Sequence, residues 1–450
     1  MHNNRSIFSE RCWFQNRLQP ATVVISAGKI IDVLLFKTDD SDDVGNDILM
    51  PGIIDAHVHI NEPGRTDWEG FETATKAAAA GGITTVIDMP LNASPVTTNV
   101  EALKLKLHST ENKLFVNVGF YGGLIPGNIE NIEALILAGV SGIKCFLSPS
   151  GIDEFPNVGE AEISEAMPII AKYGVPLLAH CELLLEEADC ALSAYPSSYK
   201  EYLASRPLKW ENDAVQLMID LCRKYHCPVH IVHVSSAEAL SIIQAAKEEG
   251  LPVTAETCAH YIYFSAELIT DKNTLFKCAP PIREAANNLL LKKALKNGVL
   301  DFLTTDHSPA PPEIKKIESG NFETGWGGIA GLQFLLPASW SALKNILDVE
   351  EFIPLLTKNP AKFLKLDRRK GSISIGFDAD LTIWDPSGME LIKEDAILHR
   401  HKMSPYAGQK LYGTVSETIV GGVSVYKNRN IVDEEIRNGK IILNKPVSQL

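Results

Sequence analysis

The chain has 450 residues, more than one domain usually holds, so we expect one large domain with a smaller attachment. Its 45% hydrophobic and 22% charged residues are typical of globular proteins and exclude a disordered or collagen-like chain. The formal net charge of −14 disfavours nucleic acid and anionic membranes as partners, because both attract basic surfaces. A small molecule is therefore the expected partner.

The first residues, MHNNRSIFSERCWF, carry charges where a signal peptide would have an apolar segment. No window approaches the roughly 18 consecutive apolar residues of a membrane span. Together these features predict a cytoplasmic protein. The eight cysteines form no CxxC pair, and several lie in apolar runs such as GIKCFL, so we expect them to be reduced and buried.

Residues 1–49 contain short β-like pieces such as ATVVIS, and residues 371–450 contain similar ones, including DADLTIWD and TVSETIVGGVSVY. Turn residues separate these pieces. We therefore expect the two ends of the chain to form one small β-sandwich-like domain.

Between residues 50 and 370, apolar runs alternate with stretches that suit amphipathic helices, such as EGFETATKAAAAGG. Eight runs occur, at 52–60, 84–90, 114–122, 141–147, 175–181, 228–234, 252–258 and 299–307. Eight strands predict an α/β fold with a closed (β/α)8 TIM barrel. A doubly wound open sheet is the alternative, but it normally has fewer strands and a glycine-rich phosphate turn after the first one.

Polar residues stand at the ends of several of these runs, where the active site of a TIM barrel lies. The first run ends with His57 and His59, whose spacing of two residues directs both rings to one face of a strand. His180, His233 and Asp306 end the fifth, sixth and eighth runs. A single such histidine is more often a hydrogen-bonded core residue, but four histidines and an aspartate at one end of a barrel predict a metal site.

Lys144 ends the fourth run, within SGIKCFL, where apolar neighbours make a charged amine costly to bury. One interpretation is a lysine that pairs with an acid or extends to solvent. The other is an amine kept neutral by burial and therefore able to react.

The combination of HVH at 57–59, Lys144, His180, His233 and DHSP at 306–309 resembles the amidohydrolase superfamily. The resemblance implies two divalent metal ions per chain, zinc being expected and cobalt, manganese or iron being alternatives. It implies that His57, His59 and Asp306 hold one ion, that His180 and His233 hold the other, and that a carboxylated Lys144 bridges them. A hydroxide shared by two such ions would attack an amide carbonyl.

Asp306 has a second role in this interpretation. As the catalytic general base and acid, it would take the proton of the attacking hydroxide and return it to the leaving nitrogen. The alternative is a purely structural ligand.

Asn61 separates this chain from one branch of the superfamily. Dihydroorotases extend the first motif to HxHxR, and the arginine holds a substrate carboxylate. Here the motif is HVHIN, which disfavours an anionic substrate. Arg65 is a possible substitute, and its alternative is a salt bridge within a loop.

Five further blocks are similar to the allantoinase family, at 62–92, 277–283, 306–313, 326–333 and 400–408. The similarity implies hydrolytic opening of the hydantoin ring of allantoin to allantoate, in purine degradation, by a homo-oligomer, either dimer or tetramer. Asn92, Ser308 and the backbone around Cys278 are the candidate substrate contacts, because a neutral ring suits amide, hydroxyl and backbone groups. Each residue also has a structural alternative. Asn92 would instead shape the turn before Ser94-Pro95, Ser308 would fix the loop after the eighth run, and Cys278 would pack in the core.

Two features leave the range of substrates open. The segment LSPSGIDEFPNV after the fourth run is shorter than in many bacterial allantoinases, and Ala279 stands where related hydantoinases commonly have serine. The alternative functions are therefore a hydantoinase or dihydropyrimidinase and, from another class, a catalytically inactive barrel that serves as a scaffold.

Overall fold

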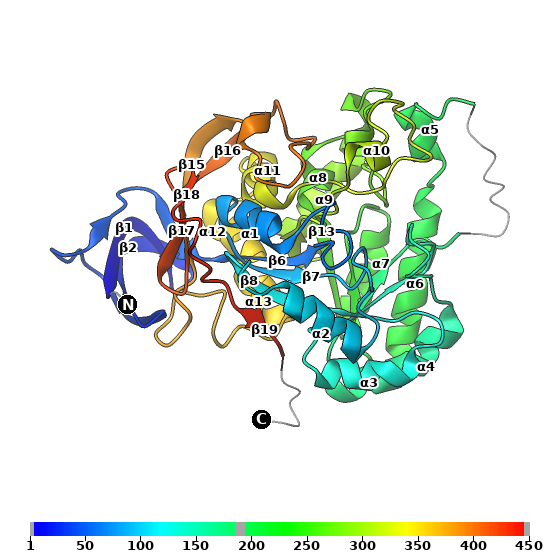
Figure 1. Ribbon diagram of the computed structural model, residues 1–450, viewed down its shortest axis with the longest axis horizontal. Coiled ribbons are helices and arrows are strands. Elements are labelled where there is room, and N and C mark those ends of the chain that lie inside the picture. Colours follow the sequence, from blue (N-terminus) through cyan, green and yellow to red (C-terminus); the bar gives the residue numbers. More distant parts are fainter. Residues whose placement is uncertain (1–3, 185–193, 445–450) are drawn as a thin grey trace.

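Parallel strands run through the middle of the chain in the computed structural model, which describes residues 4–184 and 194–444 (Figure 1). All eight runs expected from the sequence contain a strand, and the third run is divided between β8 and β9. These strands are β6 (Ile53–Val58), β7 (Ile83–Asp88), β8 (Asn117–Phe120), β9 (Gly122–Gly123), β10 (Ile143–Phe146), β11 (Leu177–His180), β12 (Val229–Ile231), β13 (Val253–Cys258) and β14 (Phe302–Thr304).

The strands pair in the order in which they occur along the chain. β6, β7 and β8 form one parallel set, and β9 to β14 form a second. A parallel bridge between Val58 and His307 joins the first strand to the segment after the last one. Nearly all their residues are buried, as expected for parallel strands that are covered on both faces. The arrangement is of the TIM-barrel type.

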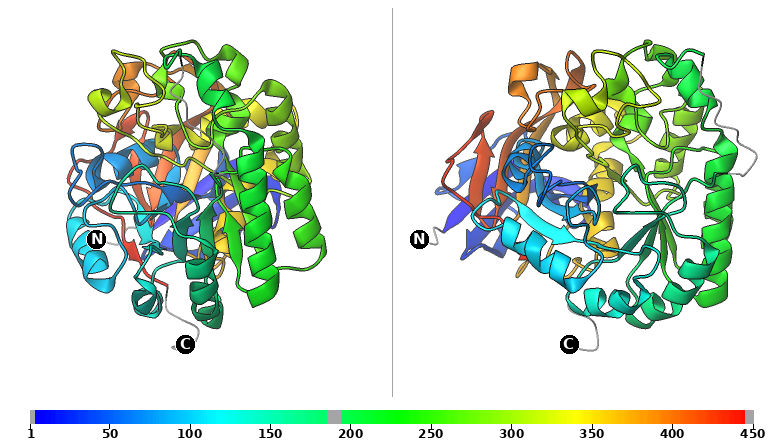
Figure 2. Two further views of the ribbon diagram at one scale, coloured as in Figure 1. Left: turned by 90° about the vertical axis from the view of Figure 1, so that its right-hand side faces the viewer. Right: turned by 45° about the vertical axis from the view of Figure 1, so that its right-hand side comes forward.

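Helices follow most of the strands and lie around the outside of them (Figure 2). α6 illustrates why they pack there: Ala214, Met218 and Cys222 are buried, whereas Gln216 and Asp220 are exposed. The helices are α1 (Phe71–Ala80), α2 (Val100–Ser109), α3 (Ile129–Leu137), α4 (Glu160–Tyr173), α5 (Tyr199–Ala204), α6 (Leu208–Tyr225), α7 (Ala239–Glu248), α8 (Ala259–Tyr263), α9 (Ala285–Lys296), α10 (Pro312–Lys315), α11 (Leu335–Leu343), α12 (Val349–Leu356) and α13 (Lys358–Phe363). Short 3₁₀ turns cover Ala266–Leu268, Thr274–Phe276, Leu332–Phe334 and Glu394–Ala396.

A separate nine-stranded sheet combines strands from both ends of the chain, at the left of Figure 1. β5 pairs with β1 on one side and with β15 on the other, which joins the two ends. Ile7, Val23, Leu49, Leu381 and Ile419 belong to its own apolar cluster. The strands are β1 (Arg5–Phe14), β2 (Arg17–Ser26), β3 (Lys29–Leu34), β4 (Asp42–Asp43), β5 (Ile48–Pro51), β15 (Leu381–Leu391), β16 (Lys410–Val420), β17 (Val423–Lys427) and β18 (Asn430–Ile431).

The last described strand, β19 (Ile441–Ile442), leaves this sheet and pairs in parallel with β8. The division of the third run into β8 and β9 explains the position of β19. β9 pairs with β10, whereas β8 pairs with β7, so the other edge of β8 is left for β19. Ile442 is buried there. The sequence patterns did not anticipate this strand.

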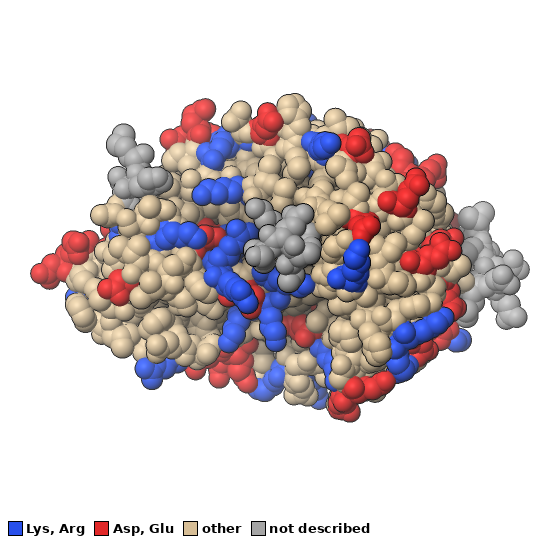
Figure 3. Space-filling model, turned by 90° about the horizontal axis from the view of Figure 1, so that it is seen from below, with Lys and Arg blue, Asp and Glu red and all other residues tan. Residues whose placement is uncertain are grey.

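The seven cysteines within the described residues are buried and form no disulfide, as expected, while Cys190 lies outside the described residues. Among the described helices, none is long and apolar enough to cross a bilayer. Figure 3 shows one face of the molecule, on which acidic and basic side chains are both present and the basic ones gather near the middle.

Candidate metal centre

His57, His59 and Asp306 meet at the ends of β6 and β14. The Nε2 atom of His57 lies 3.2 Å from Oδ1 of Asp306, and Nε2 of His59 lies 3.3 Å from the same oxygen. One candidate ligand atom from each residue lies within 4.8 Å of the others, and all three residues are buried. Two imidazoles and a carboxylate in this arrangement are able to hold a divalent ion.

The backbone directs two of the candidate ligands into the centre. Asp306 has a φ of 45° and His233 a φ of 40°, so both adopt the left-handed conformation that residues other than glycine rarely adopt. Each lies two residues beyond the end of its strand, β14 or β12. The turn therefore brings each side chain over the strand ends, at a conformational cost on the order of 1–2 kcal/mol per residue.

His180 and His233 form a second pair next to the first group. Nδ1 of His180 lies 3.0 Å from Nε2 of His233, and the ring centroids of His57 and His233 are 5.5 Å apart. Burial lowers the pKa of His180, and it lowers the pKa of His233 well below its ordinary value. Both rings are therefore neutral near pH 7, which is the form that binds a metal.

Lys144 lies on β10 with its side chain fully buried. Its Nζ atom is 4.9 Å from the ring centroid of Phe146 and has no hydrogen-bond partner within the described part of the chain. Burial lowers the pKa of this amine to about 8. Among the described residues, the amine therefore neither pairs with an acid nor extends to solvent.

Two glutamates lie within hydrogen-bond distance of the candidate histidine ligands. Oε1 of Glu256 lies 2.6 Å from Nδ1 of His57, and Oε2 of Glu182 lies 3.0 Å from Nε2 of His180. Arg206 donates to the same oxygen of Glu182 across 2.7 Å. Carboxylates at these places fix which ring nitrogen carries the proton and so direct the other nitrogen toward a metal.

Opposing effects set the pKa of both glutamates. Burial alone would raise the pKa of Glu256, but its interactions with His57 and His230 lower it to about 2. Burial is likewise outweighed at Glu182, where Arg206 and His180 lower the pKa to about 2. The sequence reasoning missed both residues, although an acid inside an apolar run, PVTAETC, and one directly after PLLAHC were the available signals.

A single cavity reaches all the predicted metal-site residues. Its lining includes the six of them together with Asn92, Glu182, Arg206, Ala279, Ser308 and Trp326. The six are His57, His59, Lys144, His180, His233 and Asp306. The strand ends therefore form the floor of one active-site cavity.

Comparison with known proteins identifies the family. Residues 48–425 match the Amidohydrolase family. The chain belongs to the amidohydrolase family. Its relatives include allantoinases from Saccharomyces cerevisiae, 40% identical over 95% of this chain and 96% of the relative, and from Arabidopsis thaliana, 42% identical over 94% and 88%. L-Hydantoinase from Arthrobacter aurescens has a similar solved structure, with a TM-score of 0.90, 27% identity and coverage of 99% of this chain and 100% of that one.

Membership of the amidohydrolase family and the His57, His59 and Asp306 cluster together indicate a divalent metal centre. The buried amine of Lys144 and Nδ1 of His233, neither of which has a hydrogen-bond partner among the described residues, fit such a centre. A buried polar group that has no hydrogen-bond partner costs free energy, and a bound metal centre would give both groups a partner.

Two of the three candidate substrate contacts of this amidohydrolase line the cavity, namely Asn92 and Ser308. The Nδ2 atom of Asn92 lies 3.3 Å from Nδ1 of His59, and Ser308 Oγ accepts from the indole of Trp326 at 3.4 Å. The third candidate, Cys278, is buried, and its carbonyl accepts a hydrogen bond from Tyr202 at 2.6 Å. The neighbouring Ala279 is the residue of that segment that lines the cavity.

Arg65 was the possible contact for a substrate carboxylate, and Asn61 stands where dihydroorotases have the arginine; both have other partners. Arg65 forms a salt bridge with Glu154 across 2.6 Å and donates to the carbonyl of Asn92 at 3.1 Å. Asn61 is buried and donates to the carbonyl of Pro309 at 3.3 Å. Arg65 therefore forms the loop salt bridge that the sequence left as its alternative role.

Proposed function

We propose that this chain is an allantoinase, which hydrolyses the hydantoin ring of allantoin to allantoate in purine degradation. The observation that carries the proposal is identity of about 40% to proteins named allantoinase over nearly the whole chain, in organisms as distant as a yeast and a plant. The matched regions span nearly the whole chain, so they cover the loops around the cavity as well as the strands.

The six cavity residues named above are assigned ligand roles within this proposal. His57, His59 and Asp306 would hold one divalent ion, and His180 and His233 would hold a second. A carboxylated Lys144 would bridge them. Burial lowers the pKa of the free Lys144 amine to about 8, which supports this role because only the neutral amine adds to carbon dioxide. Zinc is the proposed metal, with cobalt, manganese or iron as alternatives that this ligand set also accepts.

Two divalent ions would lower the pKa of a water molecule and polarise the substrate carbonyl. Asp306 is the proposed proton carrier. Burial would raise the pKa of its carboxyl group, but its contacts with His57 and His59 hold that pKa far below the usual range. The ionised carboxylate therefore accepts a proton from the attacking water and returns it to the ring nitrogen as that nitrogen leaves.

The charges around the cavity suit a neutral ring. Arg65 is paired with Glu154, and Arg206 is paired with Glu182, so neither guanidinium offers an uncompensated charge to a carboxylate. Asn92 and Ser308 are the proposed contacts to the ring and its ureido substituent, together with backbone groups next to Cys278.

The test is turnover of a panel of cyclic amides by one preparation whose metal content is measured. Allantoin, hydantoin, dihydrouracil and dihydroorotate are the substrates, and absorbance and mass spectrometry follow ring opening. We expect allantoin to be the preferred substrate and about two divalent ions per chain, with activity lost on chelation and regained with zinc. Opening of hydantoin or dihydrouracil without allantoin would refute the assignment.

A hydantoinase or dihydropyrimidinase is the second candidate, because the L-hydantoinase from Arthrobacter aurescens shares the fold over 99% of this chain. The same panel distinguishes it. An inactive scaffold is the third candidate, and it would bind no stoichiometric metal.

The division of the chain is also a proposal. We assign residues 50–370 to the catalytic barrel and residues 1–49 and 371–450 to a small β-sandwich-like domain. The nine-stranded sheet and its separate apolar cluster support that division. A homo-oligomer, either dimer or tetramer, completes the proposal, and light scattering tests it.

A further inference from the structure

Two loops form one wall of the active-site cavity. The first contains Ala279 and the second contains Trp326 and Gly327, all of which line the cavity. The loops are hydrogen-bonded to each other, because the amide of Gly328 donates to the carbonyl of Lys277 at 2.9 Å. A Cβ atom at Gly328 would lie 2.3 Å from the carbonyl oxygen of Ser308, so the second loop also packs closely against the segment after β14 that carries Asp306.

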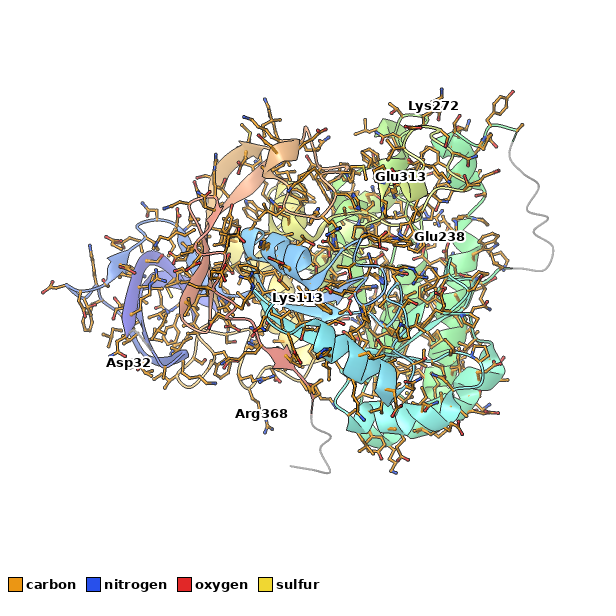
Figure 4. All side chains as sticks on the ribbon, viewed as in Figure 1. Asp32, Lys113, Glu238, Lys272, Glu313 and Arg368 are labelled. Carbon is orange, nitrogen blue, oxygen red and sulfur yellow. The ribbon has the colours of Figure 1, made fainter. Side chains whose placement is uncertain are left out.

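A buried ammonium group holds the two loops together. Lys315, at the end of α10, is 4% exposed, and its Nζ atom donates to the carbonyls of Lys277 at 2.8 Å, Trp326 at 3.0 Å and Gly328. An ammonium group has three N–H donors, and here each one meets a backbone carbonyl. The label of Glu313 in Figure 4 marks the position of α10.

The side chain of Lys277 secures the same loop from the other side. Its Nζ atom donates to the carbonyl of Gly325 at 2.6 Å and to that of Glu323 at 3.1 Å. Both buried amines therefore fix backbone carbonyls around Trp326.

Two contacts hold the indole of Trp326, and a third holds its backbone. Its ring lies edge-on to Trp68, with centroids 4.9 Å apart and an interplanar angle of 74°. Its Nε1 atom is 3.4 Å from Oγ of Ser308, and its amide donates to the carbonyl of Ile314 at 2.9 Å. The side chain is only half-buried because part of it faces the cavity.

We propose that Trp326 determines which ring substituents the cavity accepts, selecting a flat neutral ureido group, and that Lys315 is a positioning residue that holds Trp326 in place. The inference rests on the proposed function, since allantoin differs from hydantoin by its ureido substituent. A planar amide-like group lies well against an indole face, whereas a branched alkyl group does not have a flat side to present.

The first test compares the wild type with Trp326→Ala and Trp326→Phe. The readout is the ratio of kcat/KM for allantoin to that for hydantoin, which lacks the ureido group. We expect Trp326→Ala to lower this ratio by about 10- to 100-fold and to raise turnover of 5-isopropylhydantoin, while Trp326→Phe keeps most of the preference. Equal changes for allantoin and hydantoin, or no change, would overturn the proposal.

The second test compares Lys315→Met with Lys316→Met, whose side chain is exposed one residue further along. Lys315→Met should lower the allantoin-to-hydantoin ratio at least about fivefold with metal content unchanged, and Lys316→Met should leave the ratio unchanged. If Lys315→Met loses stability but keeps the wild-type ratio, Lys315 stabilises the fold without positioning Trp326, and the positioning role is overturned.

Failure of this inference is separable from failure of the proposed function. If the wild type opens hydantoin but not allantoin, the allantoinase assignment fails. In that case the preference is measured as the ratio of the dissociation constants of allantoin and hydantoin, by calorimetry on zinc-loaded protein. A ratio that is insensitive to Trp326→Ala overturns the inference, and so does a wild type that binds neither ring.

Discussion

The ring of His57 joins two carboxylates through its two nitrogens: Nδ1 lies 2.6 Å from Glu256, and Nε2 lies 3.2 Å from Asp306. Glu256 is ionised near neutral pH, since its pKa is lowered to about 2, so it only accepts hydrogen bonds. The proton of the neutral ring therefore lies on Nδ1. The lone pair of Nε2 is left to face the proposed metal.

Replacing Glu256 by glutamine should weaken the metal centre without removing a ligand. The amide no longer holds the proton on Nδ1 by charge, so we expect metal affinity to fall about 10- to 100-fold. Competition with a fluorescent chelator measures the affinity. Glu101→Gln, at an exposed position on α2, is the control. Unchanged affinity in Glu256→Gln would show that Glu256 does not orient His57.

Replacing Lys144 by alanine should abolish turnover and reduce the metal content from about two ions per chain. Short carboxylic acids such as acetate or propionate should restore part of both, because a free carboxylate can take the place of the carboxylated lysine. Mass spectrometry of metals and an activity assay provide the readouts, with exposed Lys362→Ala as the control. A fully active Lys144→Ala variant would exclude the bridging role.

Reactivation of the metal-stripped protein by zinc and carbon dioxide should depend on pH. Burial lowers the pKa of Lys144 to about 8, and the reacting form is the neutral amine, whose fraction grows as the pH rises through that value. At constant dissolved carbon dioxide we expect reactivation at pH 8.5 to be faster than at pH 6.5 by roughly tenfold or more. A rate that does not change with pH would argue against carboxylation of this amine.

Replacing Asp306 by asparagine should separate metal binding from proton transfer. The amide oxygen can still bind a metal, so part of the metal content should remain. An amide cannot carry the proton, so we expect kcat to fall by about 10²- to 10⁴-fold. Asp367→Asn, at an exposed position, is the control. Turnover close to that of the wild type would remove Asp306 as the proton carrier.

Replacing Lys106 by methionine should destabilise the protein. The ammonium group lies 2.5 Å from Asp88, both side chains are at most 1% exposed, and Asp88 also accepts from the amide of Ile60 at 2.7 Å. Leaving a buried carboxylate unpaired costs about 3–5 kcal/mol. Urea unfolding should show the loss, with exposed Lys104→Met unaffected. Adding Asp88→Asn should recover part of the stability, and no recovery would contradict this pairing.

The sequence by itself determined the strands of the barrel and the residues at their ends. Alternation of apolar runs with helical stretches is a local pattern, and so is a polar residue such as Lys144 or His180 at the end of an apolar run. Because all parallel strands of a barrel end at the same face, that pattern also predicted that the candidate ligands lie together. The structure places all six of them in one cavity.

Only the tertiary structure decided which groups surround these residues. Glu256 was found to support His57, and Lys315 was found to hold the loop of Trp326, although each pair is far apart in the sequence or separated by a turn. The pairing of β19 with β8 is of the same kind. Such contacts join residues that only the folded chain brings together. A local pattern of apolar and polar residues carries no information about which distant residues become neighbours.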